Sequence, residues 1–164
     1  MESLHAPWRI SYILSPKPPK GAESLFTRIA QSDDDITNLV VHRDRHCFVL
    51  MNRYPYNGGH LMVVPYKETS ELEDLDDTEL SALMLMTRRS IRVLKAVMDP
   101  DGFNVGLNLG KVAGAGIEEH LHYHVVPRWS GDSNFMPVIA HTGVVPEALM
   151  ETAAKIREAF PHHP

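Results

Sequence analysis

The spacing of apolar and polar residues along the chain predicts three helices. In "AESLFTRIAQ" the apolar positions recur at helical intervals and predict a short helix over residues 22–31. A longer helical pattern begins at Asp76, where Glu79 completes a capping box, and it ends before Asp99. The segment "PEALMETAAKIREAF" predicts a last helix, because Pro146 occupies the favoured early position.

Runs of apolar and β-branched residues between turn signals predict five strands. They cover residues 36–44, 46–52, 60–66, 102–110 and 120–127, and Pro127 is expected to end the last of them. The stretch "RYPYNGGH" supplies turn residues between the second and third strands and predicts a hairpin there. Five strands beside one long helix indicate an α+β fold.

At 164 residues the chain fits one domain. A chain of that length buries roughly 70% of the surface that its unfolded form exposes, so it can build a core without staples. Residues 1–21 are rich in proline and predict an extended arm. We expect the main domain over residues 22–135 and a C-terminal extension, 136–164, whose helix packs on the same domain.

Composition restricts the partners of the chain. Sixteen Lys and Arg against 21 Asp and Glu give a net charge of −5 at pH 7, which opposes binding to polymeric nucleic acid. No stretch approaches the roughly 20 apolar residues that span a bilayer, and the N-terminus lacks a signal-peptide pattern. The single cysteine, Cys47, lies in an apolar run and indicates a buried free thiol. We expect a cytoplasmic protein with no membrane partner.

The stretch "EEHLHYHVVPRW" places three histidines at alternate positions. Side chains of a strand alternate between its faces, so His120, His122 and His124 are expected on one face, about 6.5–7 Å apart. Leu121 and Tyr123 then point to the opposite face and anchor the row to the core. The pattern predicts a rigid platform that carries three imidazoles.

Four interpretations of this row are open. The histidines carry no chemistry, or they bind zinc as a His-x-His pair completed by a third ligand. An imidazole can also attack phosphorus, while its neighbours neutralise the anion. The loop upstream contains Gly110, Gly114 and Gly116, whose N–H groups suit phosphate oxygens, and this favours nucleophilic catalysis. The fourth interpretation is a nucleotide sensor that uses the same residues without turnover.

The motif "HLHYHVV" resembles the His-φ-His-φ-His-φ-φ signature of the histidine triad (HIT) superfamily of nucleotide hydrolases and transferases. The stretch "CFVLMNRYPYNGGHLMVVP" is similar to the hairpin of that family, and "NLGKVAGAG" to its phosphate-binding loop. Both "APWRISYI" and "PRWSGDSNF" resemble the branch that contains the fragile histidine triad protein and the bacterial diadenosine tetraphosphate phosphorylases.

The resemblance implies a HIT-like fold whose antiparallel sheet of about five strands extends across a homodimer, with a tetramer also open. Met84 and Met86 are then candidates for the interface. It implies cleavage of a diadenosine tetra- or triphosphate, or a related adenine nucleotide, at the α-phosphate through a nucleotidyl-histidine. An adenosine phosphoramidase and a non-catalytic sensor are the alternatives.

The resemblance also assigns roles to residues. His122 would be the nucleophile, and its supporting and substrate-binding residues would be His120, His124, His60, Asn52, Asn108, Gly116 and Ile117. Ser24 and Thr27 stand where many bacterial relatives carry the Cys-x-x-Cys of a structural zinc site. We therefore expect no structural zinc and no required cofactor. Gly116 and Ile117 replace the Gln or Ser of fragile-type members, so backbone amides are the expected donors to the bridging oxygen.

Overall fold

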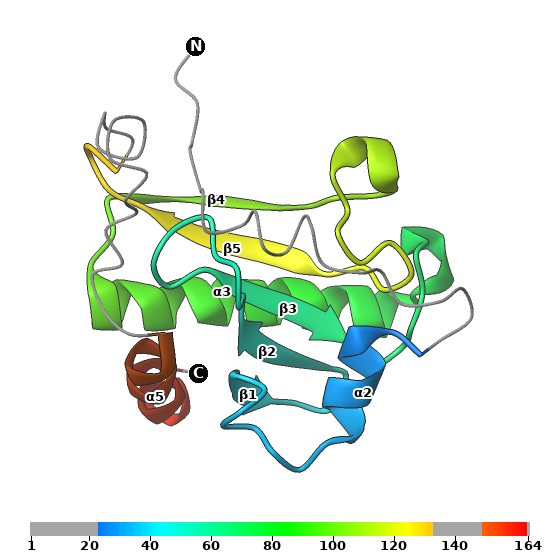
Figure 1. Ribbon diagram of the computed structural model, residues 1–164, viewed down its shortest axis with the longest axis horizontal. Coiled ribbons are helices and arrows are strands. Elements are labelled where there is room, and N and C mark those ends of the chain that lie inside the picture. The colour runs from blue at the N-terminus through cyan, green and yellow to red at the C-terminus, as the bar shows by residue number, and fades with distance from the viewer. Residues whose placement is uncertain (1–22, 133–148, 164) are drawn as a thin grey trace.

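The computed structural model describes residues 23–132 and 149–163, so the predicted arm and residues 136–148 of the predicted extension lie outside the described residues. The fold is α+β, as predicted, with one antiparallel sheet in the order β1-β2-β3-β5-β4 (Figure 1). The strands are β1 (Val40–Arg43), β2 (Cys47–Met51), β3 (Leu61–Pro65), β4 (Gly102–Leu107) and β5 (Tyr123–Arg128). The α-helices are α2 (Leu25–Gln31), α3 (Asp77–Met98) and α5 (Leu149–Ala159); the 3-10 turns are η2 (Leu72–Asp74), η3 (Lys111–Ala113) and η4 (Phe160–His162).

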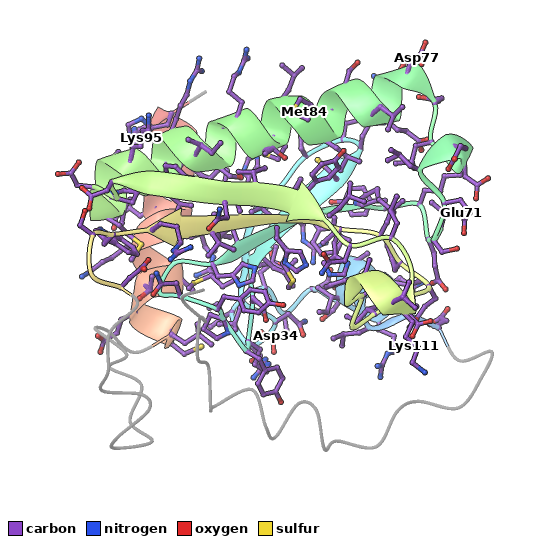
Figure 2. The ribbon with its side chains drawn as sticks, turned by 90° about the horizontal axis from the view of Figure 1, so that it is seen from above. Asp34, Glu71, Asp77, Met84, Lys95 and Lys111 are labelled. Carbon is purple, nitrogen blue, oxygen red and sulfur yellow. The ribbon has the colours of Figure 1, made fainter. Side chains whose placement is uncertain are left out.

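The two faces of the sheet are covered differently. Helices α3 and α5 bury the main core on one face, where Ala153, Ile156 and Phe160 of the C-terminal segment join the strand side chains. On the other face the short helix α2 covers only part of the sheet, through Phe26 and Ile29. Figure 2 shows α3 along one side of the sheet and the turn that carries Lys111 on the other. The partly covered face is therefore the one that has room for a ligand.

Helix α3 forms where its local signals predicted. The side chain of Asp76 accepts hydrogen bonds from the backbone of Thr78 and Glu79, and Glu79 completes the capping box. Met84 is 54% exposed on this helix, but Met86 is buried in the main core. The expectation that both methionines face a partner is therefore wrong for Met86, because the helical period turns that residue toward the sheet.

Strand boundaries differ from the prediction, and two of the differences lie beside the site. The β5 ladder begins at Tyr123, so His120 and His122 precede the strand, and β4 ends at Leu107. Pro127 lies inside β5 opposite Phe103 rather than ending the strand. This position is tolerated because β3 pairs with β5 only as far as Val125, so Pro127 has no strand neighbour on that side.

Gly59 makes a close approach between the hairpin and α3. Its φ is +74°, and a Cβ at this position would lie 2.5 Å from Sδ of Met98. Only glycine adopts that conformation without strain. The next residue is His60, so this turn fixes the point at which the chain enters β3 and presents the histidine.

We predict that Gly59→Ala destabilises the protein by about 1–2 kcal/mol, because a Cβ in the left-handed region is strained. The matched control is Gly106→Ala on β4, where no atom lies within 4 Å of the added methyl group. We expect that control to change the free energy of unfolding by less than about 0.5 kcal/mol in urea denaturation. Equal losses in the two variants would contradict the argument from backbone strain.

Candidate active site

A cavity opens on the face of the sheet that α2 partly covers. Six of the predicted site residues line it: Asn52, Asn108, Gly116, Ile117, His122 and His124. They come from the ends of β2, β4 and β5 and from the loop between β4 and β5. His60 and His120 do not line the cavity but contact the rings or backbone of the histidines that do. The structure thus brings all eight residues together, in two layers.

His122 has one ring nitrogen committed to the backbone. Its Nδ1 lies 2.9 Å from the carbonyl oxygen of His120, and a carbonyl only accepts, so Nδ1 carries a hydrogen. The ring is 7% exposed and lies edge-on to Phe26. Burial lowers the pKa of His122, with the hydrogen bond to the His120 carbonyl opposing that shift and the nearby His120 ring adding to it. The neutral ring therefore keeps its lone pair on Nε2, the nitrogen that a nucleophile needs.

His60 and His124 form a second pair with the opposite arrangement of hydrogens. The backbone N–H of Tyr56 donates to Nδ1 of His60 at 3.1 Å, so the hydrogen of His60 is on Nε2. That nitrogen lies 2.9 Å from Nδ1 of His124, which must accept. The hydrogen of His124 is consequently on Nε2. The ring centroids of His122 and His124 are 4.8 Å apart, so the two imidazoles are direct neighbours.

His120 is fully buried behind the other two triad histidines. Its Nε2 lies 2.8 Å from the carbonyl oxygen of Pro65, and its Nδ1 lies 2.8 Å from Oγ of Ser24. Leu121 and Tyr123 point into the main core, so the side chains do alternate. His120 and His122 lie on the same side, since both rings contact Phe26, but His120 is buried and both of its ring nitrogens are engaged inside the protein.

The loop between β4 and β5 borders the same cavity. Gly110 and Gly114 have φ values of +77° and +90°, which lets the loop turn tightly around η3. The side chain of Asn108 donates to the carbonyl oxygen of Gly114 at 3.4 Å and holds the two ends of the turn together. Ile117 packs against the small core beneath α2. Because Gly116 and Ile117 have no polar side chain, only backbone N–H groups can donate from these two positions.

Apolar side chains form another part of the cavity lining. Leu25, Phe26 and Ile29 of α2 line it together with Leu39 and Leu50. Phe26 also contacts the His122 ring, with the ring centroids 4.9 Å apart, so the apolar lining from α2 reaches the histidines. A ligand with a charged group at the histidines and a flat apolar group against α2 would match this lining.

Several residues that line the cavity were not predicted from the sequence. Asn38, Arg53, Tyr54 and Tyr56 line the cavity. Tyr56 also sets the hydrogens of His60 through its backbone N–H, which the sequence does not reveal. Ser24 could have been noticed as the N-cap of α2, since serine just before an apolar helical run is a capping signal.

Neither a metal centre nor a reactive thiol is apparent among the described residues. Across residues 23–132 and 149–163, no three His, Cys, Asp or Glu side chains gather as metal ligands. Cys47 is buried, and burial raises the pKa of its thiol to about 12. At neutral pH it remains a protonated apolar group.

Comparison with known proteins assigns the family. The HIT domain family matches residues 33–131. The chain belongs to the HIT family. An AP-4-A phosphorylase from Mycobacterium tuberculosis is 44% identical to this HIT protein over 170 residues, which cover 100% of this chain and 87% of the relative. An asymmetrical bis(5'-nucleosyl)-tetraphosphatase from Schizosaccharomyces pombe is 30% identical over 93 residues, covering 57% of this chain and 50% of the relative.

A solved structure supports the fold of this HIT protein. A zinc-bound histidine triad family protein from Mycobacterium smegmatis superposes with a TM-score of 0.69 at 23% identity, covering 85% of this chain and 94% of that one. The predicted HIT-like fold is therefore confirmed. Among the helices of the described segments, none has both the length and the apolar character that crossing a bilayer requires.

We predict that His122 stays neutral to lower pH than an ordinary histidine, because desolvation penalises its charged form. Its ring should titrate below 6.5 in an NMR titration, and His122→Asn identifies the signal by its disappearance. Since only the neutral ring can attack phosphorus, the acid limb of kcat/KM should lie below that pH as well. A midpoint at or above 6.5 would contradict the argument from burial.

Proposed function

We propose that this HIT protein cleaves adenosine-containing dinucleoside polyphosphates by transferring a nucleotide first to His122 and then to inorganic phosphate. The observation that carries the proposal is the hydrogen bond from Nδ1 of His122 to the His120 carbonyl, which leaves Nε2 as a nucleophile. The choice of phosphate as acceptor is supported by the M. tuberculosis AP-4-A phosphorylase, which is 44% identical over 170 residues, covering 100% of this chain.

In the first step, Nε2 of His122 forms a bond to the α-phosphorus of diadenosine tetraphosphate. The bond from that phosphorus to the bridging oxygen breaks, and ATP leaves. His124 supports this step because its Nε2–H is a donor beside the nucleophile, and the loop N–H groups of Gly116 and Ile117 supply further donors. The apolar lining from α2 would hold the adenine ring, and Asn52 and Asn108 are proposed contacts for the ribose and the α-phosphate.

In the second step, an oxygen of inorganic phosphate attacks the same phosphorus. The bond to Nε2 of His122 breaks, ADP leaves and the neutral imidazole is restored. The His120 carbonyl would assist, because it stabilises the positive charge that the ring carries as a nucleotidyl-histidine. If water replaced phosphate, the product would be AMP. That hydrolase reaction is the second candidate, because the S. pombe tetraphosphatase is 30% identical over 57% of this chain.

We predict that diadenosine tetraphosphate yields ADP and ATP, that phosphate is required, and that turnover persists in EDTA because no metal takes part. Chromatography of the products with and without phosphate measures the outcome. AMP and ATP without phosphate would support the hydrolase instead. Loss of turnover in EDTA, with about one metal per chain by elemental analysis, would favour the metal interpretation.

The same assay tests the nucleophile. His122→Asn should lower kcat/KM by at least about a thousandfold, because an asparagine cannot act as the nucleophile in the covalent step. The matched control is His162→Asn, which changes an exposed histidine near the C-terminus and should keep full activity. Mass spectrometry of quenched protein should find an added adenylyl group on the wild type. Binding without this adduct and without turnover would indicate a sensor.

We further propose that the protein is a homodimer through α3 and the edge strand β4. Met84 and Leu85 are 54% and 52% exposed on α3, and Val105 is 44% exposed on β4. Side chains of this kind are usual in subunit contacts. Met84→Glu should shift the molar mass in light scattering to that of a monomer. An unchanged mass, or a tetramer that persists in the variant, would place the contact elsewhere.

A further inference from the structure

We propose that Ser24 is a positioning residue for His122, which it reaches through His120. Its hydroxyl holds the His120 ring, and the main-chain carbonyl of that residue holds the nucleophile. This role rests on the proposed function only in its expected effect on kcat. The geometry on which it is built is independent of the substrate.

Both nitrogens of the His120 ring are held from opposite sides. The Pro65 carbonyl at the end of β3 and the Ser24 hydroxyl at the start of α2 each lie 2.8 Å from one of them. Ser24 and His120 are both fully buried. The contact between them joins residues that lie 96 positions apart in the chain. Phe26 adds an edge-on ring contact at 5.5 Å. The ring therefore ties α2 to β3 at the point where the triad begins.

The partners fix where the hydrogens lie. Because the Pro65 carbonyl only accepts, Nε2 of His120 carries a hydrogen. Burial lowers the pKa of His120, so the ring is neutral and Nδ1 accepts the hydrogen of the Ser24 hydroxyl. The same oxygen accepts from the backbone N–H of Thr27 at 3.0 Å as the N-cap of α2. One hydroxyl thus begins the helix and holds the histidine.

Thr27 and Glu68 both contact Ser24. The hydroxyl of Thr27 donates to the carboxylate of Glu68, and this bond is the main reason that the pKa of Glu68 is lowered. The backbone N–H of Ser24 lies 3.4 Å from the same carboxylate. Oγ1 of Thr27 also lies 3.1 Å from Oγ of Ser24, but the shorter contact, 2.8 Å, is to Nδ1 of His120, which carries no hydrogen and needs a donor.

The support matters because strand pairing does not reach His120. The ladder between β3 and β5 begins at Tyr123, and before it the backbone is tied by the hydrogen bond from Leu121 N–H to the Thr69 carbonyl. The His120 carbonyl, which accepts from His122, lies in the same planar peptide group as the Leu121 N–H, so the bond to Thr69 and the ring contacts of His120 together hold its orientation. A shift of about 1 Å in such a group can cost a hundredfold in rate.

Three variants separate this role from capping. Ser24→Gly removes the hydroxyl but keeps a residue that N-caps tolerate, whereas Ser24→Thr keeps both the hydroxyl and the cap. The matched control is Ser90→Ala, which deletes another fully buried serine hydroxyl, on α3 and away from the cavity. Each variant is assayed with diadenosine tetraphosphate for kcat and KM. The ¹⁵N signals of His122 are recorded on the protein without substrate.

We expect Ser24→Gly to lower kcat about ten- to a hundredfold with KM within about threefold, and to give His122 a mixture of tautomers. Ser24→Thr and Ser90→Ala should keep the wild-type kcat and the single Nδ1–H form. An unchanged kcat or an unchanged His122 tautomer in Ser24→Gly would overturn the inference. If the wild type itself shows no turnover, the proposed function fails, while the tautomer signals still decide the role of Ser24.

Discussion

The hydrogen bond from His122 to the His120 carbonyl is the contact on which the proposed chemistry of this site depends. It commits one nitrogen of a buried ring to the backbone and leaves the lone pair on the other. Burial alone would make the imidazole neutral but would not choose between its two tautomers. The backbone makes that choice, so the ring nitrogen that keeps the lone pair is set by the path of the main chain rather than by a neighbouring charge.

The same principle distinguishes the hydrogen bonding of the four histidines. His60 receives a backbone hydrogen from Tyr56 and passes its own toward His124, whereas His120 is held at both nitrogens away from the cavity. Identical side chains thus become donor, acceptor or anchor according to the group that each ring meets. A charged metal or arginine is not required to distinguish them, since carbonyl and N–H groups have only one hydrogen-bonding direction each.

Local signals in the sequence predicted much of the architecture. The capping box at Asp76 and the alternation that sends Leu121 into the main core are properties of neighbouring residues, and both appear in the structure. The predicted strand began at residue 120, whereas β5 begins at Tyr123, because alternation does not show where strand pairing starts. The contact between Ser24 and His120 had no sequence signal, since it spans 96 residues and depends on how α2 is docked.

Methionine gives a second example of this limit. Met84 and Met86 are two positions apart on α3, yet one is half exposed and the other buried, because a helix turns about 200° over that distance. The sequence marks both as apolar and does not say which side the sheet will occupy. The site residues Asn52 and Asn108 were found through resemblance to a family, because single asparagines after strands are otherwise unremarkable.

Helix α2 has only seven residues, and helices of that length are unstable in isolation. It is held by Phe26 and Ile29 against the sheet and by the Ser24 hydroxyl at its first turn. The support that α2 gives to the triad therefore comes from its packing on the sheet rather than from the helix itself. Opening of α2 alone would remove the Ser24 contact and leave the His120 ring held by the Pro65 carbonyl, while the sheet and α3 remain folded. The two supports of one imidazole thus belong to different elements, and only the one from β3 is part of the sheet.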